Sequence, residues 1–187
     1  MAGSQRSFAA RSSTRRRGAV GSRVLHPDRR LHSAGWVIWR DADLSAMGLH
    51  APVHDDLFLE RRAVDFASSS ALLVRGEVWD AVGGLDERFN PAYYIDVDLG
   101  MAIRSLGRLV LYEPGARTLH QGGASGSARA REELMERNRD LFRGKWATKL
   151  AAHEEPGEGG RGVRASDGAH SSGGRAHSSG TECRHRR

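Results

Sequence analysis

The chain has 187 residues, of which 39% are hydrophobic, which suffices for one domain with a single core. Its formal charge of +6 is concentrated at the ends, because residues 1–17 hold five Arg and no acid and residues 151–187 hold six Arg against five acids. The remaining 18 basic and 18 acidic residues cancel within residues 18–150. A neutral folded part lacks the one-sided basic face that nucleic-acid binding requires, so we expect no nucleic-acid partner.

Cysteine content and hydropathy set further limits. The single Cys183 excludes a framework of internal disulfides and fits a reducing compartment. No apolar run approaches the roughly 18 residues that a transmembrane helix needs, so we expect no transmembrane segment. These features favour a cytoplasmic location, which is compatible with peripheral contact at the inner membrane.

Both ends of the chain have compositions that disfavour folding. Residues 1–17 are rich in Arg and Ser and lack sustained apolar periodicity, and from residue 156 onward Gly, Ser, His and Arg dominate. Such segments cannot bury enough apolar surface to offset the entropy cost of ordering. We therefore expect a disordered arm over residues 1–17, a folded domain over residues 18–150 and a disordered tail over residues 151–187.

In the middle, short strands alternate with helices, which predicts an α/β fold. Strands are expected around residues 64–66 and 71–74, and a short helix over residues 77–82 ends at Gly83-Gly84. A longer helix begins near Asp96 and Asp98, and its apolar residues recur at helical spacing: Leu99, Ala102, Ile103 and Leu106.

Glycine and proline residues indicate where the elements after this helix begin and end. Gly107 stops the helix, and we expect strands over residues 108–112 and 117–120, separated by a turn at Pro114-Gly115. A last amphipathic helix is expected over residues 132–150.

Two segments carry a functional signal: GGLDERFNPAYYIDVDL, residues 83–99, and LYEPGARTLHQGGAS, residues 111–125. They resemble the C-terminal half of family 2 glycosyltransferases, in which a GGFDE loop and a tyrosine-rich stretch lead to an acidic E-D-x-D-L motif, then to a strand, a Pro and a His. The resemblance extends over residues 18–150. It implies a truncated GT-A (nucleotide-diphospho-sugar transferase-like) domain, the acceptor-side half of an inverting enzyme that adds a sugar from a nucleotide donor to a cell-surface polysaccharide.

Asp96 is the candidate general base. An inverting transfer needs a carboxylate that takes the proton from an acceptor hydroxyl while its oxygen attacks the anomeric carbon. Asp96 lies at a loop-to-helix junction, where a carboxylate can face a cleft, and the resemblance aligns it with the Asp of the family's E-D pair. The alternative is a helix N-cap, a role that we also expect for Asp98.

The resemblance further implies acceptor-binding residues. It aligns a group of residues with the GGFDE loop and the tyrosine-rich stretch: Gly83, Gly84, Asp86, Glu87 and Tyr94. Glycines allow tight backbone geometry there, the acids can contact the acceptor, and the tyrosine offers a flat face to a sugar ring. The alternatives are a helix C-cap with solvated acids, and core packing of the tyrosine.

His120 is the candidate metal ligand. It aligns with a His that in some family members helps to hold the divalent cation, Mn or Mg, at the donor diphosphate. The alternative is a surface histidine bonded to the Gly122-Gly123 turn. The family's donor-binding half, with its metal-holding D-x-D motif, has no counterpart upstream of residue 18, so we expect no cation to bind tightly and no transfer by this chain alone.

Three positions depart from the family pattern. Ile95 replaces the Glu of the E-D pair, Ser69 stands in place of a Gly, where its side chain would narrow the site, and Arg29 replaces a turn Gly. The leading hypothesis is a glycosyltransferase-related chain that derives from an inverting enzyme and is incomplete as a catalyst alone. Its partners would be a nucleotide-sugar donor and a glycan acceptor, with a complementary half that supplies the donor site. The alternatives are a non-catalytic interaction or acceptor-binding module, and a gene remnant. A sheet without its first strands is expected to expose an edge and an apolar patch.

Overall fold

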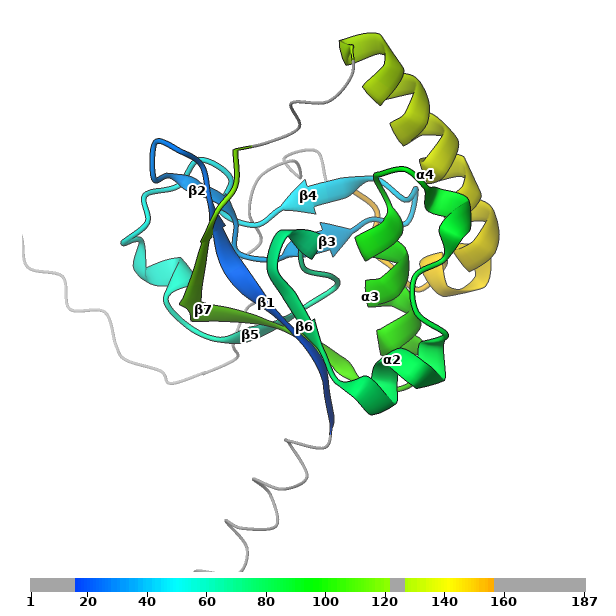
Figure 1. Ribbon diagram of the computed structural model, residues 1–187, viewed down its shortest axis with the longest axis horizontal. Coiled ribbons are helices and arrows are strands. Elements are labelled where there is room, and N and C mark those ends of the chain that lie inside the picture. The colour runs from blue at the N-terminus through cyan, green and yellow to red at the C-terminus, as the bar shows by residue number, and fades with distance from the viewer. Residues whose placement is uncertain (1–15, 122–126, 157–187) are drawn as a thin grey trace, which may run out of the picture.

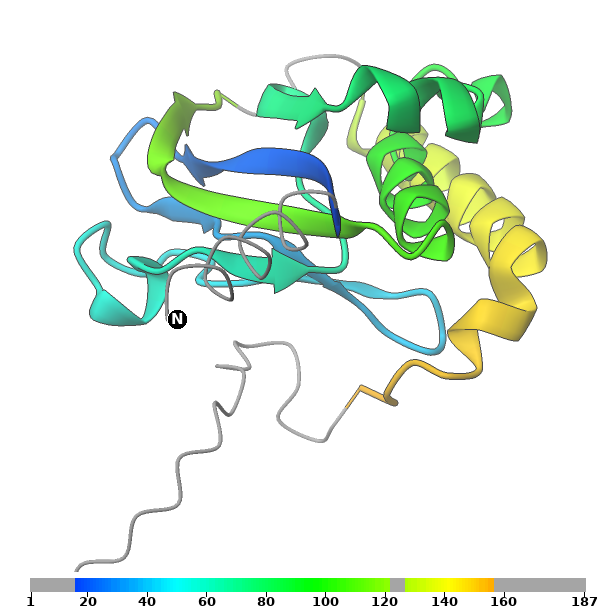
Figure 2. The same cartoon turned by 90° about the horizontal axis from the view of Figure 1, so that it is seen from below.

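The computed structural model describes residues 16–121 and 127–156, which form a mixed α/β domain (Figure 1). Helices α2 (Gly76–Val82), α3 (Ile95–Ser105) and α4 (Ala128–Leu150) lie together on one side of the molecule, next to a curled sheet, in both views (Figures 1 and 2). The α/β class predicted from the sequence is confirmed. None of the described helices is long and apolar enough to cross a membrane.

The packed region extends past the expected boundary at residue 150. The Arg40 amide donates to the Glu154 carbonyl at 2.9 Å, and Nδ1 of His153 lies 2.7 Å from the Ile38 carbonyl. Residues 151–155 therefore belong to the domain, because their backbone connects the end of α4 to the segment of residues 38–40 by hydrogen bonds. Of the disordered arm expected over residues 1–17 and the disordered tail expected over residues 151–187, residues 1–15 and 157–187 fall outside the described residues.

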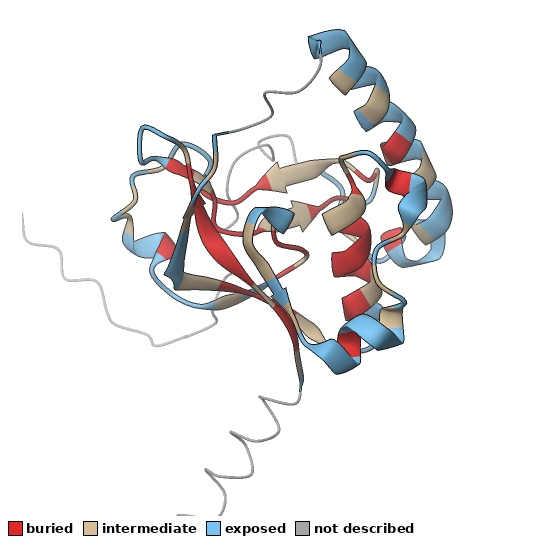
Figure 3. Ribbon diagram, in the orientation of Figure 1, coloured by how far each residue is buried: buried red, intermediate tan, exposed pale blue. Residues whose placement is uncertain are grey.

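The central strand of the larger sheet is β1 (Arg17–Leu25), whose residues are almost all buried (Figure 3). It pairs in parallel with β7 (Leu109–Leu119) and antiparallel with β2 (Leu31–Ser33) and β6 (Leu72–Val74), and β5 (Arg62–Val64) pairs with β7. A smaller antiparallel sheet contains β3 (Trp36–Ile38) and β4 (Leu44–Ala46). A strand that is covered on both faces needs buried residues along nearly its whole length, and β1 has them.

The turn expected at Pro114-Gly115 is wrong, because β7 is one continuous strand. Ser22 pairs with Glu113 and Arg23 pairs with Arg117, so the three residues between those partners form a bulge in β7. The Glu113 carboxylate accepts a hydrogen bond from the Gly115 amide at 3.0 Å inside this bulge. A bulge can contain Pro114, because the unpaired residues of a bulge need not donate an amide to the neighbouring strand. On both sides of this bulge, β7 pairs with β1.

Helix α3 packs between two hydrophobic clusters. Leu99 and Ile103 contribute to the cluster formed with the large sheet, whereas Val97 and Met101 contribute to the cluster shared with Phe142 of α4. The expected helix is confirmed, but its buried surface is wider than the predicted stripe, and Leu106 is 46% exposed. Contacts on both sides fix the position of α3 and of the residues in its first turn.

Strand β6 has an open edge, whereas an edge left by missing first strands of the sheet stays a prediction. Within the described residues β6 pairs with β1 only, and Leu73 at its centre is 75% exposed. Unpaired backbone groups beside an exposed leucine form an edge that favours pairing with a further strand.

Gly100 provides a test of the α3 packing. A Cβ at this position would lie 2.4 Å from the Phe66 Cβ and 2.9 Å from the Asp65 carbonyl oxygen, so we expect Gly100→Ala to destabilise the fold by about 1–3 kcal/mol. Gly144 of α4 is the matched control, because its Cβ would meet nothing within 4 Å and Ala is the better helix former. Urea unfolding of both variants measures the effect, and equal stability for the two would contradict this packing.

Candidate functional site

The loop from α2 to α3 carries most of the residues predicted to bind an acceptor. Gly83 caps α2 with φ of 79°, and its amide donates to the Trp79 and Asp80 carbonyls. Gly84, with φ of 77°, donates to the Trp79 carbonyl at 3.1 Å. Both positions need the left-handed conformation that glycine adopts readily, so the C-cap alternative describes their backbone role. A contact between these glycines and an acceptor stays a prediction.

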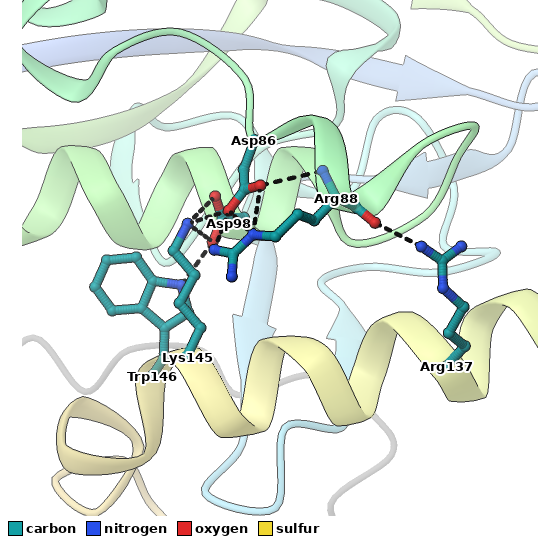
Figure 4. Close-up of polar contacts among 6 residues, drawn as sticks. All are labelled: Asp86, Arg88, Asp98, Arg137, Lys145 and Trp146. Atoms are coloured by element: carbon teal, nitrogen blue, oxygen red, sulfur yellow. Dashed lines mark hydrogen bonds and ion pairs between the residues drawn. The ribbon is translucent and has the colours of Figure 1, made fainter.

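Asp86 lies at the centre of a polar cluster (Figure 4). Its carboxylate caps the 3₁₀ helix η3 (Glu87–Phe89) by accepting from the Arg88 amide at 3.1 Å, and it also accepts three hydrogen bonds from the Arg88 guanidinium. Lys145 of α4 adds a contact of 2.8 Å. The hydrogen bonds from Arg88, helped by Lys145 and opposed by partial burial, hold the pKa of Asp86 well below its usual range.

The other two predicted acceptor residues differ in exposure. Glu87 is exposed, whereas Tyr94 is 4% exposed and packs its ring against Phe142 with centroids 5.6 Å apart. The Tyr94 hydroxyl donates to the Ala42 carbonyl at 2.9 Å, and burial raises its pKa to about 12. The core-packing alternative therefore describes Tyr94 in this structure, and acceptor contact by Glu87 stays a prediction.

Asp98 is the residue that sequence reasoning misjudged. It is 4% exposed, and its carboxylate lies 2.8 Å from Nζ of Lys145 and accepts a bond from the Trp146 indole at 2.7 Å (Figure 4). The expected capping role is wrong, since the N-cap residue of α3 is Tyr94, whose side chain makes no capping hydrogen bond, and the Asp98 carboxylate faces α4 instead. Lys145 thus bridges the carboxylates of Asp86 and Asp98, which lie on the loop and on α3.

Helix α4 also holds the backbone of the loop. The buried Asn138 directs its amide nitrogen at the Phe89, Ala92 and Tyr93 carbonyls, at 2.9, 2.7 and 2.9 Å. Arg137 donates to the Arg88 carbonyl at 2.7 Å, as Figure 4 shows. These bonds give partners to carbonyls of η3 and of the irregular segment that follows it, where a carbonyl buried without a donor would be costly.

Asp96 lies in the first turn of α3 and is half-buried. Its Oδ1 accepts from the Val97 amide at 3.1 Å, and its Oδ2 accepts from the Ser69 amide at 3.0 Å. It is not the N-cap residue, although the positive end of the helix dipole favours a carboxylate there. Each oxygen keeps a lone pair beyond its one amide contact, so this carboxylate can still accept a proton. The role of general base stays a prediction.

His120 lies directly after β7, where its amide donates to the Leu25 carbonyl at 2.9 Å. Its ring centroid is 5.6 Å from that of His32, whose pKa is lowered first by burial and then by the neighbouring His26, His120 and His50. Among the described residues, no group of three or more His, Cys, Asp or Glu side chains is arranged to hold a metal ion. Metal binding by His120 stays a prediction, and the Gly122-Gly123 turn lies outside the described residues.

Comparison with known proteins supports a glycosyltransferase-like region. No protein-family model matches the chain. Over 59 residues it is 46% identical to the N-acetylglucosaminyl-diphospho-decaprenol L-rhamnosyltransferase of two Mycobacterium tuberculosis strains, which covers 32% of the chain and 19% of that enzyme. Over 139 residues it is 30% identical to the uncharacterized protein y4gI of Sinorhizobium fredii, which covers 70% of the chain and 15% of y4gI. The chain thus spans less than a fifth of the length of these curated relatives.

The Asp86 cluster predicts a pH dependence of stability. The folded-state pKa of Asp86 is depressed, so its contribution is complete above the unfolded value of about 4 and is lost as pH falls toward the folded value. We expect Asp86→Asn to lower stability at neutral pH and to flatten the loss of stability between about pH 5 and pH 2. Urea unfolding across this range measures both effects.

Glu87→Gln is the control for this experiment, because it removes an equal charge from an exposed neighbour outside the Arg88 and Lys145 contacts. Its stability profile should keep the wild-type shape. Parallel profiles for the wild type and Asp86→Asn would show that the cluster contributes nothing to acid stability.

Proposed function

We propose that this chain forms the acceptor side of an inverting family 2 glycosyltransferase with a GT-A fold, in which Asp96 is the general base. The observation that carries the proposal is the placement of Asp96: a half-buried carboxylate in the first turn of α3, fixed by two backbone amides. Its surroundings include the segment of residues 83–99 that resembles the family's acceptor motif. The similarity to a rhamnosyltransferase over 59 residues supports the same reaction class.

In the proposed reaction, an acceptor hydroxyl approaches a lone pair of the Asp96 carboxylate that no amide occupies. The hydroxyl oxygen forms a bond to the anomeric carbon, its proton passes to Asp96, and the bond to the nucleoside diphosphate breaks on the opposite face of the sugar. A complementary polypeptide segment supplies the nucleotide-sugar site. The described residues do not form a cluster that fits Mn or Mg, so no step is assigned to a cation on this chain.

The acceptor is proposed to be a lipid-linked saccharide diphosphate, by extension from the acceptor in the name of the mycobacterial relative. Such a substrate places the reaction at the inner membrane, which the chain would meet as a peripheral protein. Among the predicted acceptor residues, Glu87 is the best placed to contact a sugar because it is exposed, whereas Asp86 already accepts bonds from Arg88 and Lys145.

A non-catalytic acceptor-binding module is the second candidate. It is favoured by Ile95, which puts a β-branched apolar side chain beside Asp96, at the position where the resemblance implies a carboxylate. Ile95 packs against the cluster that contains Phe142 and Tyr94, so its side chain serves the core. An enzyme and a non-catalytic module would both bind the acceptor, but only the enzyme would catalyse transfer of the sugar.

The base assignment is tested by Asp96→Asn in the chain co-expressed with the donor-binding half of the mycobacterial relative. Transfer of a labelled sugar to N-acetylglucosaminyl-diphospho-prenol should fall about 100-fold or more, since the amide cannot take the proton. Asp80→Asn, at an exposed acid of α2, should retain the rate. Near-full activity of a folded Asp96→Asn variant would falsify the assignment, and binding of the acceptor without any turnover by the wild type would favour the second candidate.

The separate donor site gives a second prediction. We expect the isolated chain to show no micromolar binding of uridine, guanosine or thymidine diphosphate sugars in the presence of manganese, because its described residues assemble no cluster for the cation. Isothermal titration calorimetry measures this directly. Tight binding that requires manganese would overturn the proposal that another segment supplies the donor site.

A further inference from the structure

The turn that contacts Asp96 offers a backbone amide that its own helix does not use. The 3₁₀ helix η2 (Ser69–Ala71) begins after Ser68, whose hydroxyl accepts from the Ser70 amide at 3.3 Å. The first amide of a helix has no partner inside it. In η2 this is the Ser69 amide, and it donates to Oδ2 of Asp96 at 3.0 Å.

This bond joins two elements that are far apart in sequence. Ser69 is the first residue of η2, which immediately precedes β6, the strand paired with β1, while Asp96 belongs to α3. The second contact of the carboxylate comes from the Val97 amide of α3 itself. One donor on the helix and one on the sheet side restrict the rotation of the carboxylate more than either donor could alone, since each occupies a different oxygen.

We propose that the Ser69 backbone amide is a positioning group for Asp96, an inference that rests on the proposed role of Asp96 as general base. The amide holds Oδ2 at a fixed place relative to β6, so that a lone pair of the carboxylate keeps one direction toward the incoming hydroxyl. Orientation of this kind contributes to rate because a small misplacement of a reacting group slows proton transfer severely.

The backbone amide of Ser69, and not its side chain, is the group that acts on Asp96. The sequence led us to expect that a side chain at this position would narrow the site. In the structure Ser69 is exposed, and the group that contacts Asp96 is the backbone amide, which every residue except proline possesses. The identity of the side chain at position 69 should therefore matter little, and the presence of the amide should matter strongly.

This distinction gives a matched pair of variants, Ser69→Ala and Ser69→Pro. Proline fits the backbone, because Ser68 has φ of −58° and ψ of 136°, a conformation that residues before proline favour. The first position of a helix also tolerates proline. The substitution removes the amide and places a ring carbon against Oδ2, so Asp96 must leave its observed orientation, whereas Ser69→Ala keeps the amide.

The test uses the co-expressed enzyme for kinetics and the isolated chain for structure. We expect Ser69→Pro to lower kcat by roughly 10-fold or more with little change in the acceptor KM, and Ser69→Ala to leave both near the wild type. Equal kcat values for the two variants would overturn the proposal. A loss of acceptor binding in Ser69→Pro, with kcat retained at saturation, would overturn it as well, because it would assign the amide to substrate binding.

An independent measurement on the wild-type chain covers the case in which Ser69→Pro fails to fold. A scalar coupling across the hydrogen bond, between the Ser69 amide nitrogen and the Asp96 carboxyl carbon, is expected in the magnetic resonance spectrum, together with a single side-chain rotamer for Asp96. Averaged rotamers without this coupling would refute the positioning role. This result does not depend on turnover, so it is distinguishable from failure of Asp96 as a base, which the Asp96→Asn variant decides.

Discussion

The buried amide of Asn138 is the interaction on which the candidate site most depends. The loop between η3 and α3 contains Tyr93 and Tyr94 in the left-handed conformation, so its carbonyls cannot join a regular ladder. From a fully buried position, Asn138 offers its amide nitrogen to two carbonyls of this loop, those of Ala92 and Tyr93, and to the Phe89 carbonyl at the end of η3. A buried carbonyl without a donor costs about 1–3 kcal/mol, so an apolar residue at position 138 would lose this loop conformation and with it the start of α3.

The ion pair between Lys145 and Asp98 also holds the loop and α3 against α4. Asp98 is almost fully buried, and Lys145 and the Trp146 indole supply the cation and the hydrogen-bond donor that a buried carboxylate requires. Lys145 remains partly exposed and also contacts Asp86, so one ammonium fixes the loop against α3. We expect a buried ion pair of this kind to add little net stability and to favour one register between α3 and α4.

The sequence predicted those features that local chemistry determines. The end of α2 was predictable because Gly83 suits the left-handed C-cap, and α3 was predictable from its acids and apolar spacing. The single strand β7 was not, because Pro114-Gly115 is a good turn signal and only pairing with β1 shows it to be a bulge. The roles of Asp98 and Asn138 depend on partners more than 40 residues away, and no spacing rule in one sequence connects such positions.

The geometry of α3 explains why Asp96 and Asp98 lie in different environments. Two residues that are two positions apart in a helix point in directions about 200° apart, so the pair cannot share one environment. Asp98 points toward α4, where Lys145 and Trp146 neutralise it, and Asp96 therefore points away, toward the turn before β6. The buried member holds the helix in place by its ion pair, and this leaves the half-buried member as the carboxylate that can meet a substrate.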